Sequence, residues 1–394
     1  MLEKAQALAP ELIRLRREIH QHPELSFREF RTAQLVAETL LEIGIEPQTG
    51  VGRTGVTAEI GNIDGPTIAI RADMDALPID EKNDVPYRSQ VPGVMHACGH
   101  DAHTAMLLGA AHLLKQSMAE DQWRGKVRFI FQPSEEAFDA DGLSGAPAMI
   151  ADGALQNVDA VIALHVWSNG RSGLFNYYDG MSMAAVDSFD AQIIGDGGHG
   201  AFPHDGVDPV HILGYVLNAL YAIPSRQINP LRPAVVSVCQ VEGGQTHNVI
   251  PKAVRLKGTI RSFDDEVRHQ LWREVERAFK ISEILGGCYE LNITKGYPGL
   301  CNDPLVNQWV TQAARDMLGE TAVVETELGM GAEDFAYMAQ EAPGAMLFLG
   351  AATPDGVKRY HHTETFDIDE SVLPLGTAVL AETARRFVTG EITT

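Results

Sequence analysis

The sequence is poor in three features that would direct it to a special environment: cysteines, basic residues and long apolar runs. Its four cysteines are scattered, so their spacing indicates neither a disulfide framework nor a zinc ribbon and favours a reducing, cytoplasmic setting. Lys and Arg number 31 against 53 Asp and Glu, and the net charge of −22 disfavours nucleic acid and anionic lipid as partners. No apolar run approaches the length of a membrane helix and the N-terminus shows no signal-peptide core, so we expect neither a membrane span nor secretion.

The remaining composition is that of an ordinary globular protein, and 394 residues favour two domains over one. Several short apolar runs end in polar residues, and such runs are typical of strands buried on both faces of a mostly parallel sheet. A helical pattern at 104–116 lies between two of them, which predicts an α/β fold with its ligand crevice beyond the carboxyl ends of the strands. The runs are TIAIRADMD (67–75), KVRFIFQPSEE (126–136), DAVIALHV (159–166) and AMLFLGA (345–351).

The middle of the chain has a different pattern. Strand-like and helix-like segments there follow the order β-α-β-β-α-β, which is that of a ferredoxin-like unit. We therefore predict an inserted domain at 185–296, which divides a catalytic domain into residues 1–184 and 297–394.

The stretch MHACGHDAHT (95–104) gathers three histidines, a cysteine and an aspartate. Cys98 and His100 flank a glycine, so both side chains can face one ion, and a thiolate with an imidazole suits zinc and similar divalent metals. Capping of a helix that begins near Thr104 is the simpler alternative, and this stretch alone does not decide between them. By contrast, His20 and His22 end a surface-like helix, and we interpret them as structural.

Three further signals favour the metal. Glu135 and Glu136 follow an apolar strand and Pro133, and two adjacent carboxylates repel each other unless cations neutralise them, although a solvated acidic loop is the usual interpretation of such a pair. His165 lies in an apolar strand, where a single histidine is more often a core residue. Near the C-terminus, His361 and His362 point in opposite directions if extended, so we expect only one to reach a metal.

Taken together, these segments resemble the M20 metallopeptidase family, in particular its amidohydrolase branch of N-acyl-amino-acid amidohydrolases, hippurate hydrolases and auxin-conjugate hydrolases. The resemblance implies an α/β, phosphorylase/hydrolase-like zinc-peptidase domain with an inserted ferredoxin-like domain that serves as lid and dimerisation domain. Asp73 stands where the broader family has a metal-binding histidine, and Cys98 supplies the cysteine that this branch recruits instead. The matching segments are HQHPELSF, RADMDALPI, MHACGHDAHT, FQPSEE, ALHVW, GGHGAFPH, THNVIP, GTIRSF, GAEDFAYM and HHTETFDIDE.

The resemblance also implies roles for individual residues. Two divalent metal ions, zinc or manganese with cobalt and nickel possible, would be held by five ligands. Glu135 would be the general base, Asp75 would orient a ligand, and His199 would stabilise the oxyanion, a role for which His204 is the alternative. Asn248 and Arg261 would bind the substrate carboxylate, although Arg261 also fits a surface position on an exposed strand face. The implied ligands are Cys98, His100, Glu136, His165 and His362.

The sequence therefore predicts a homodimeric, cytoplasmic metallo-amidohydrolase that cleaves N-acyl-amino acids to a carboxylate and a free amino acid. Dimerisation is expected through the inserted domain. The same motifs fit a dipeptidase, a carboxypeptidase or a deacetylase of an N-acetylated intermediate. A metal-binding module without activity is a further alternative, which the intact Glu135-Glu136 pair disfavours because binding alone requires no base.

Overall fold

The computed structural model describes residues 1–62, 64–326 and 329–392. The chain divides into two compact units. The larger unit comprises Met1–Ser182, Cys301–Leu328 and Asp334–Thr394, and the smaller one comprises Met183–Leu300 with Gly329–Glu333. The predicted inserted domain of 185–296 lies within the smaller unit, whose second segment, 329–333, the sequence did not indicate.

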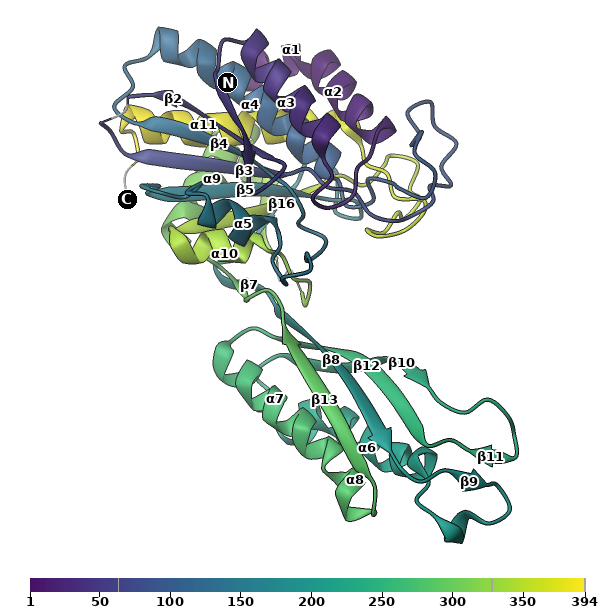
Figure 1. The fold of residues 1–394 in the computed structure, drawn as a ribbon. Helices are drawn as coiled ribbons and strands as arrows, with labels where there is room; N and C mark the ends of the chain where they lie inside the picture. The colour runs from purple at the N-terminus through teal and green to yellow at the C-terminus, as the bar shows by residue number, and fades with distance from the viewer. Residues whose placement is uncertain (63, 327–328, 393–394) are drawn as a thin grey trace. The chain divides into compact units, whose positions relative to one another are not determined.

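The larger unit is built on an eight-stranded sheet of order β1-β2-β4-β3-β5-β16-β6-β15 (Figure 1). Its four central strands β4, β3, β5 and β16 are mutually parallel, and every residue of β3 is buried. The apolar runs thus form the parallel strands that their composition predicted, and the mixed α/β fold is confirmed. The strands are β1 (Pro47–Val51), β2 (Gly55–Gly61), β3 (Thr67–Asp73), β4 (Lys126–Gln132), β5 (Ala160–Trp167), β6 (Phe175–Tyr177), β15 (Val323–Glu325) and β16 (Gly344–Gly350).

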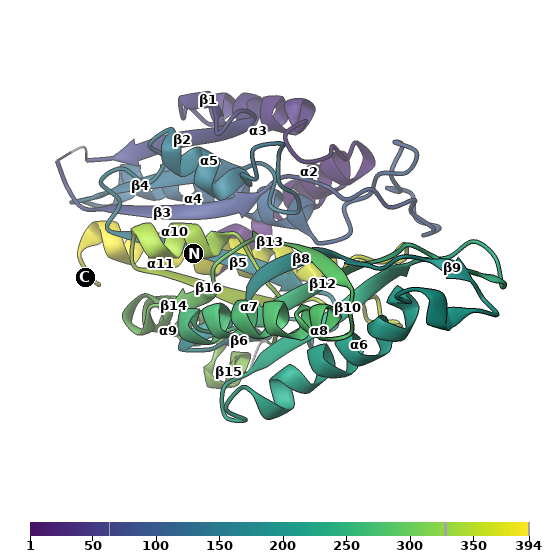
Figure 2. The same ribbon diagram turned by 60° about the horizontal axis from the view of Figure 1, so that its bottom comes forward.

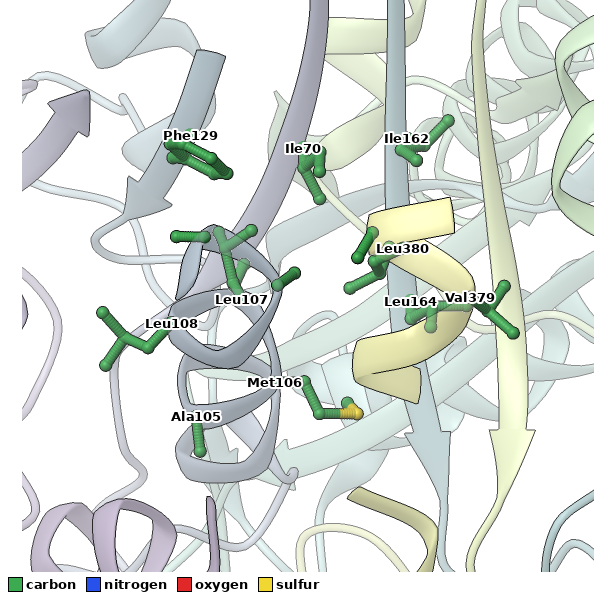
Figure 3. Packing of buried hydrophobic residues seen from close by; sticks show 14 of the residues in the cluster. Ile70, Ala105, Met106, Leu107, Leu108, Phe129, Ile162, Leu164, Val379 and Leu380 are labelled. Carbon is green, nitrogen blue, oxygen red and sulfur yellow. The ribbon is translucent and has the colours of Figure 1, made fainter. Parts of the chain in front are cut away.

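Helices cover both faces of this sheet. The helices α4 (His100–Glu120) and α11 (Leu373–Thr389) contact each other and β3 on one face, where Met106 and Leu107 of α4 and Leu380 of α11 are buried (Figure 3). On the other face lie α5 (Gly145–Ala151) and α10 (Phe335–Glu341) (Figure 2). The remaining helices of the unit are α1 (Leu2–Ala7), α2 (Ala9–Gln21), α3 (Phe30–Glu42) and α9 (Pro304–Leu318), with the 3₁₀ turns η2 (Glu320–Ala322) and η3 (Glu370–Val372).

The helix α4 begins at His100, four residues before the predicted start. Its N-cap is Gly99, whose φ of 100° lies in the left-handed region that favours glycine. A Cβ atom at this position would also lie 2.2 Å from Cγ2 of Val166. The glycine therefore permits both the turn and the close approach to β5, and it places His100 and His103 in the first turn of the helix.

The longer strands and helices of the smaller unit follow the order β8-α6-β10-β12-α7-β13. Its antiparallel sheet has the order β10-β12-β8-β13, and α6 and α7 contact this sheet around a core that includes Phe189, Leu256 and Leu271. A short pair of strands, β9 and β11, is added to this pattern. The bounds are β8 (Ala185–Ile194), β9 (Gly198–His199), η1 (Pro203–Asp205), α6 (Pro209–Arg226), β10 (Ala234–Glu242), β11 (Val249–Ile250), β12 (Ala253–Ser262), α7 (Asp265–Phe279), α8 (Ile281–Ile284) and β13 (Cys288–Lys295).

Two more strands, β7 (Gly180–Met183) and β14 (Leu300–Asn302), pair with each other. Among the described helices, none combines the length and the apolar character needed to span a membrane.

Candidate metal centre

Titratable side chains converge at the carboxyl ends of β3, β4 and β5. Cys98, His100 and His165 form one group in which the potential ligand atoms all lie within 4.8 Å of one another. By the same criterion Cys98 joins Glu136 and His362, and His100 joins Glu135 and Glu136. The larger unit thus brings together all five residues predicted to bind metal, with the predicted base beside them.

The hydrogen bonds of His100 leave one ring nitrogen available. Its Nδ1 lies 2.9 Å from the backbone carbonyl of Asp75 and 3.2 Å from Oδ1 of the same residue, so Nδ1 carries the proton and donates it. Its Nε2 is buried and has no hydrogen-bond partner among the described residues. A buried ring nitrogen without a hydrogen-bond partner is what a metal ligand requires.

In His165, as in His100, the ring nitrogen Nδ1 donates a hydrogen bond to a backbone carbonyl. Its Nδ1 donates to the carbonyl oxygen of Val166 at 2.7 Å, and its Nε2 lies 3.6 Å from Sγ of Cys98. Burial, together with the neighbouring His103 and His361, holds the pKa of His165 well below its usual value. The imidazole is therefore neutral, and its free lone pair lies beside the thiol.

The carboxylates around His100 and Cys98 produce a negative potential that favours a bound cation. Burial alone would lower the pKa of His100, but the carboxylates of Asp73, Asp75 and Glu136 outweigh it and raise the pKa to about 10. Without a metal, Nε2 of His100 therefore carries a proton at neutral pH, and metal binding would displace it. Burial, together with the carboxylates of Glu136, Glu135 and Asp73, raises the pKa of the Cys98 thiol well above its usual value. A divalent metal would offset the repulsion between these carboxylates and a Cys98 thiolate, and so would stabilise the thiolate. The donor set of thiolate, imidazole and carboxylate suits zinc and similar metals, so the residues present fit the implied metal ions.

Asp75 holds the acidic pair in place. Its Oδ1 accepts the backbone N–H of Glu135 and its Oδ2 accepts that of Glu136, both at 3.0 Å, and the Ser26 hydroxyl donates to Oδ2 at 2.6 Å. The same carboxylate lies beside Nδ1 of His100. Asp75 therefore contacts both a predicted ligand and the backbone that carries the predicted base.

A residue that sequence reasoning missed, Glu29, holds the preceding residue of this turn. Ser134 has a φ of 48°, which is unusual for a residue other than glycine, and its N–H donates to Oε1 of Glu29 at 2.9 Å. The Thr54 hydroxyl donates to the other oxygen. Burial, with repulsion from Asp75, raises the pKa of Glu29 to about 7. Glu29 lies two residues after the matching segment HQHPELSF, so the sequence offered no signal for this role.

Both members of the C-terminal histidine pair lie close to predicted ligands, and the expectation that only one of them binds metal stays a prediction. Nε2 of His362 lies 3.1 Å from Oε1 of Glu136, while Nδ1 of His361 lies 3.7 Å from Sγ of Cys98. Both reach the cluster because the backbone is not extended here: His362 has a φ of 60°. Burial lowers the pKa of His361 to about 3, so it is a neutral neighbour of the site.

The expectation for His20 was also wrong in part, because His20 is fully buried rather than surface-like. Its Nδ1 lies 2.7 Å from Oδ2 of Asp101, which also accepts from Nε of Arg16 at 2.8 Å. This buried network links α2 to the first turn of α4. His20 is structural, as predicted, but it acts from the core.

The three remaining predicted residues belong to the smaller unit. His199 lies on β9 and Asn248 directly precedes β11, and the carbonyl oxygen of Asn248 accepts the N–H of Gly200 at 2.9 Å. Both side chains are exposed, and the pairing of β9 with β11 brings them together. Arg261, on β12, is half-buried and donates to the Thr259 hydroxyl at 3.2 Å. Within the described ranges it forms no salt bridge with a carboxylate.

Comparison with known proteins places this site in a family. The model of peptidase family M20/M25/M40 matches residues 69–386. The chain is 43% identical to thermostable carboxypeptidase 2 of Saccharolobus solfataricus over 95% of both chains. It is 42% identical to the N-acetyl-L-cysteine deacetylase of Bacillus subtilis over 97% of this chain and 89% of that protein.

A solved structure agrees. The Bacillus subtilis YXEP protein, described as a dinuclear metal-binding peptidase of the M20 family, superposes with a TM-score of 0.82 at 36% identity, covering 97% of this chain and 99% of that one. These matches confirm the predicted resemblance and a metal-dependent hydrolase of the amidohydrolase and peptidase type. The chain belongs to peptidase family M20/M25/M40.

Proposed function

We propose that this enzyme hydrolyses the amide bond of N-acyl-amino acids, releasing a carboxylate and a free amino acid. The observation that carries the proposal is the acidic pair Glu135-Glu136, which Asp75 holds beside three overlapping groups of potential metal ligands. A binding site alone would need no base at this position. Metal ions bound here would polarise the amide carbonyl and lower the pKa of a water molecule.

Individual residues of the larger unit would then have separate roles in the reaction. Cys98, His100, Glu136, His165 and His362 would hold two divalent ions, for which zinc, manganese, cobalt and nickel are all chemically acceptable. Glu135 would accept the proton of the attacking water and deliver it to the nitrogen of the leaving amine. Asp75 would keep His100 in the tautomer that presents Nε2 to the metal.

The smaller unit would recognise the substrate. We propose that it is a ferredoxin-like lid, in which His199 would stabilise the oxyanion. Asn248 and Arg261 would bind the substrate carboxylate, and the lack of a salt bridge at Arg261 within the described ranges leaves its guanidinium available for this. The strand β10 is an edge strand of this unit's sheet, which supports the further proposal of a homodimer formed through the inserted domain.

A second candidate is peptide hydrolysis, which is favoured by the likeness to a carboxypeptidase. A third is deacetylation of an N-acetylated intermediate, favoured by the likeness to a deacetylase. All three use the same centre and differ in the acyl group. We also propose a cytoplasmic enzyme, which the four free cysteines support.

The test is a comparison of kcat/KM for acetyl-amino acids, benzoyl-amino acids and dipeptides with the metal-loaded enzyme. Each substrate is paired with its C-terminal amide, which lacks the carboxylate. Preference for acyl-amino acids, with a loss of about tenfold or more on amidation, supports the proposal. Preference for dipeptides would move the function to peptide hydrolysis, and no turnover of any substrate would overturn the enzymatic account.

A further inference from the structure

Asp73, His103 and Arg71 form a buried hydrogen-bonded chain beside the centre. Nη1 of Arg71 donates to Oδ2 of Asp73 at 2.7 Å, and Nδ1 of His103 lies 2.6 Å from Oδ1 of the same carboxylate. All three side chains are almost completely buried. Arg71 is itself anchored, because its Nε donates to Gln132 at 2.8 Å and its Nη2 to Asp334 at 3.1 Å.

The partners of His103 define its tautomer. Its Nε2 accepts the backbone N–H of Val166 at 2.9 Å, so this nitrogen carries no proton and Nδ1 donates to Asp73. Both ring nitrogens are therefore engaged. Asp73, His100 and His103 have potential ligand atoms within 4.8 Å of one another, but His103 has no lone pair left for an ion. The geometry points to a support for the metal centre rather than to another metal site.

These three hydrogen-bonded residues support His165. Val166, whose N–H binds His103, directly follows His165 and also accepts the proton of His165 Nδ1 through its carbonyl oxygen. The rings of His103 and His165 pack edge to face with centroids 4.6 Å apart. His103 thus restrains both the backbone beside His165 and one side of its ring, while Nε2 of His165 remains directed at Cys98.

We propose that Arg71, Asp73 and His103 form a positioning relay that fixes the tautomer and orientation of His165 for metal binding, with His103 as the residue that joins the buried carboxylate to the ligand strand. The inference rests on the proposed function only in that it takes His165 as a ligand. Residues that orient a metal-binding histidine in this way typically contribute a factor of about 10 to 100 to metal affinity.

Two substitutions separate the two hydrogen bonds of His103. In His103→Gln the side-chain oxygen reaches the position of Nε2 and can still accept the Val166 N–H. In His103→Asn the amide nitrogen matches Nδ1 and can still donate to Asp73, but the contact with Val166 is lost. The control is His112→Asn, farther along the same helix, where Nε2 of the histidine ring accepts from the Gln116 side chain at 2.8 Å.

The measurement is the zinc dissociation constant of the full chain, obtained by competition with a chromophoric chelator. The relay predicts about 10- to 100-fold weaker zinc binding in His103→Asn and no change in His112→Asn. It predicts a smaller loss in His103→Gln, which keeps the hydrogen bond to Val166 but loses the one to Asp73. Equal zinc affinity in wild type and both His103 variants would overturn it. An equal loss in both variants would also overturn it, because it would assign His103 a packing role alone.

A second measurement needs no folded variant. Long-range ¹H–¹⁵N spectra of zinc-loaded wild type should show His103 protonated at Nδ1 and unprotonated at Nε2, and a proton on Nε2 would overturn the relay. Failure of the proposed function is a separate result. A wild-type chain that binds zinc with the predicted His103 behaviour but cleaves no amide would refute the function and leave the relay standing.

Discussion

The carboxylate of Asp75 accepts the backbone N–H of Glu136 at 3.0 Å, and its other oxygen accepts that of Glu135 at the same distance. One side chain after β3 therefore fixes the turn after β4. The turn in question carries one predicted metal ligand and the predicted base, while the same carboxylate lies 3.2 Å from Nδ1 of His100. The relationship ties ligand geometry and base geometry to a single residue.

Replacing Asp75 by Asn should disturb the geometry of both the predicted metal ligands and the predicted base. The amide can accept only through its oxygen, so one of the two backbone N–H groups loses its acceptor, at a cost of about 1–3 kcal/mol. We expect kcat/KM to fall by about 10- to 100-fold, with weaker zinc binding. The matched control is Ser26→Ala, which removes a single hydrogen bond to Asp75 and should cost only a few-fold. Equal effects of the two substitutions would contradict the role assigned to Asp75.

Replacing Glu135 by Gln should separate chemistry from binding. The variant keeps the size and backbone of the acidic pair but cannot accept a proton, so kcat should fall by about 10²- to 10⁴-fold while the metal content stays at the wild-type value. Metal content by mass spectrometry and kcat on one N-acyl-amino acid check this. Turnover close to wild type would remove Glu135 as the base.

Replacing Gly99 by Ala should damage the metal site through sterics. The new methyl group would meet Val166 at 2.2 Å in addition to the left-handed backbone strain of about 1–2 kcal/mol. Gly93→Ala is the control, because Gly93 has a φ of 74° but nothing within 4 Å of the place that a Cβ atom would take, so only the backbone strain applies. We expect Gly99→Ala to lose more unfolding free energy and more zinc affinity than Gly93→Ala. Similar losses in both would show that the approach to Val166 is unimportant.

Glu29 gives a prediction about pH. Its pKa is raised from 4.5 to about 7 in the folded protein, so the folded state binds the proton more tightly than the unfolded state does. The contribution of this carboxyl to stability is therefore present at low pH and lost as the pH rises from about 4.5 to about 7. Glu29→Gln removes this dependence. Between pH 5 and pH 8, the stability of metal-free Glu29→Gln relative to metal-free wild type should increase by about 2–3 kcal/mol.

Denaturant unfolding of both proteins at the two pH values measures this difference. Comparing the variant with wild type cancels the titration of most other groups, although Asp75 is coupled to Glu29 by repulsion and should be replaced in a parallel Asp75→Asn series. A relative stability that does not change between pH 5 and pH 8 would contradict the raised pKa.

The closeness of the predicted ligands in the larger unit agrees with the strand pattern and with the family resemblance, while their binding of metal stays a prediction. Parallel strands place their carboxyl ends at one edge of a sheet, so polar residues that follow β3, β4 and β5 had to approach one another. The order of elements in the smaller unit was predictable for a similar reason, since alternating burial on β8 and β12 is visible in the residues themselves.

Other features could not be predicted because they depend on contacts between distant segments. Glu29 binds Ser134, which lies 105 residues later, and His20 binds Asp101, which lies 81 residues later. The early start of α4 was missed because a glycine inside a motif looks like a break, whereas here it is the left-handed N-cap. Likewise, His361 and His362 both lie close to predicted ligands where His362 adopts a positive φ, which no sequence pattern predicts.

The central claim is that the cluster around Cys98 and His100 is a catalytic metal centre. The most direct test is to strip the enzyme of metal and titrate zinc or manganese back while recording amine release from an N-acyl-amino acid. The account predicts no turnover by the metal-free enzyme and a rise in activity that levels off at two metal ions per chain. Full turnover by the metal-free enzyme, or activity that does not respond to added metal, would contradict the account.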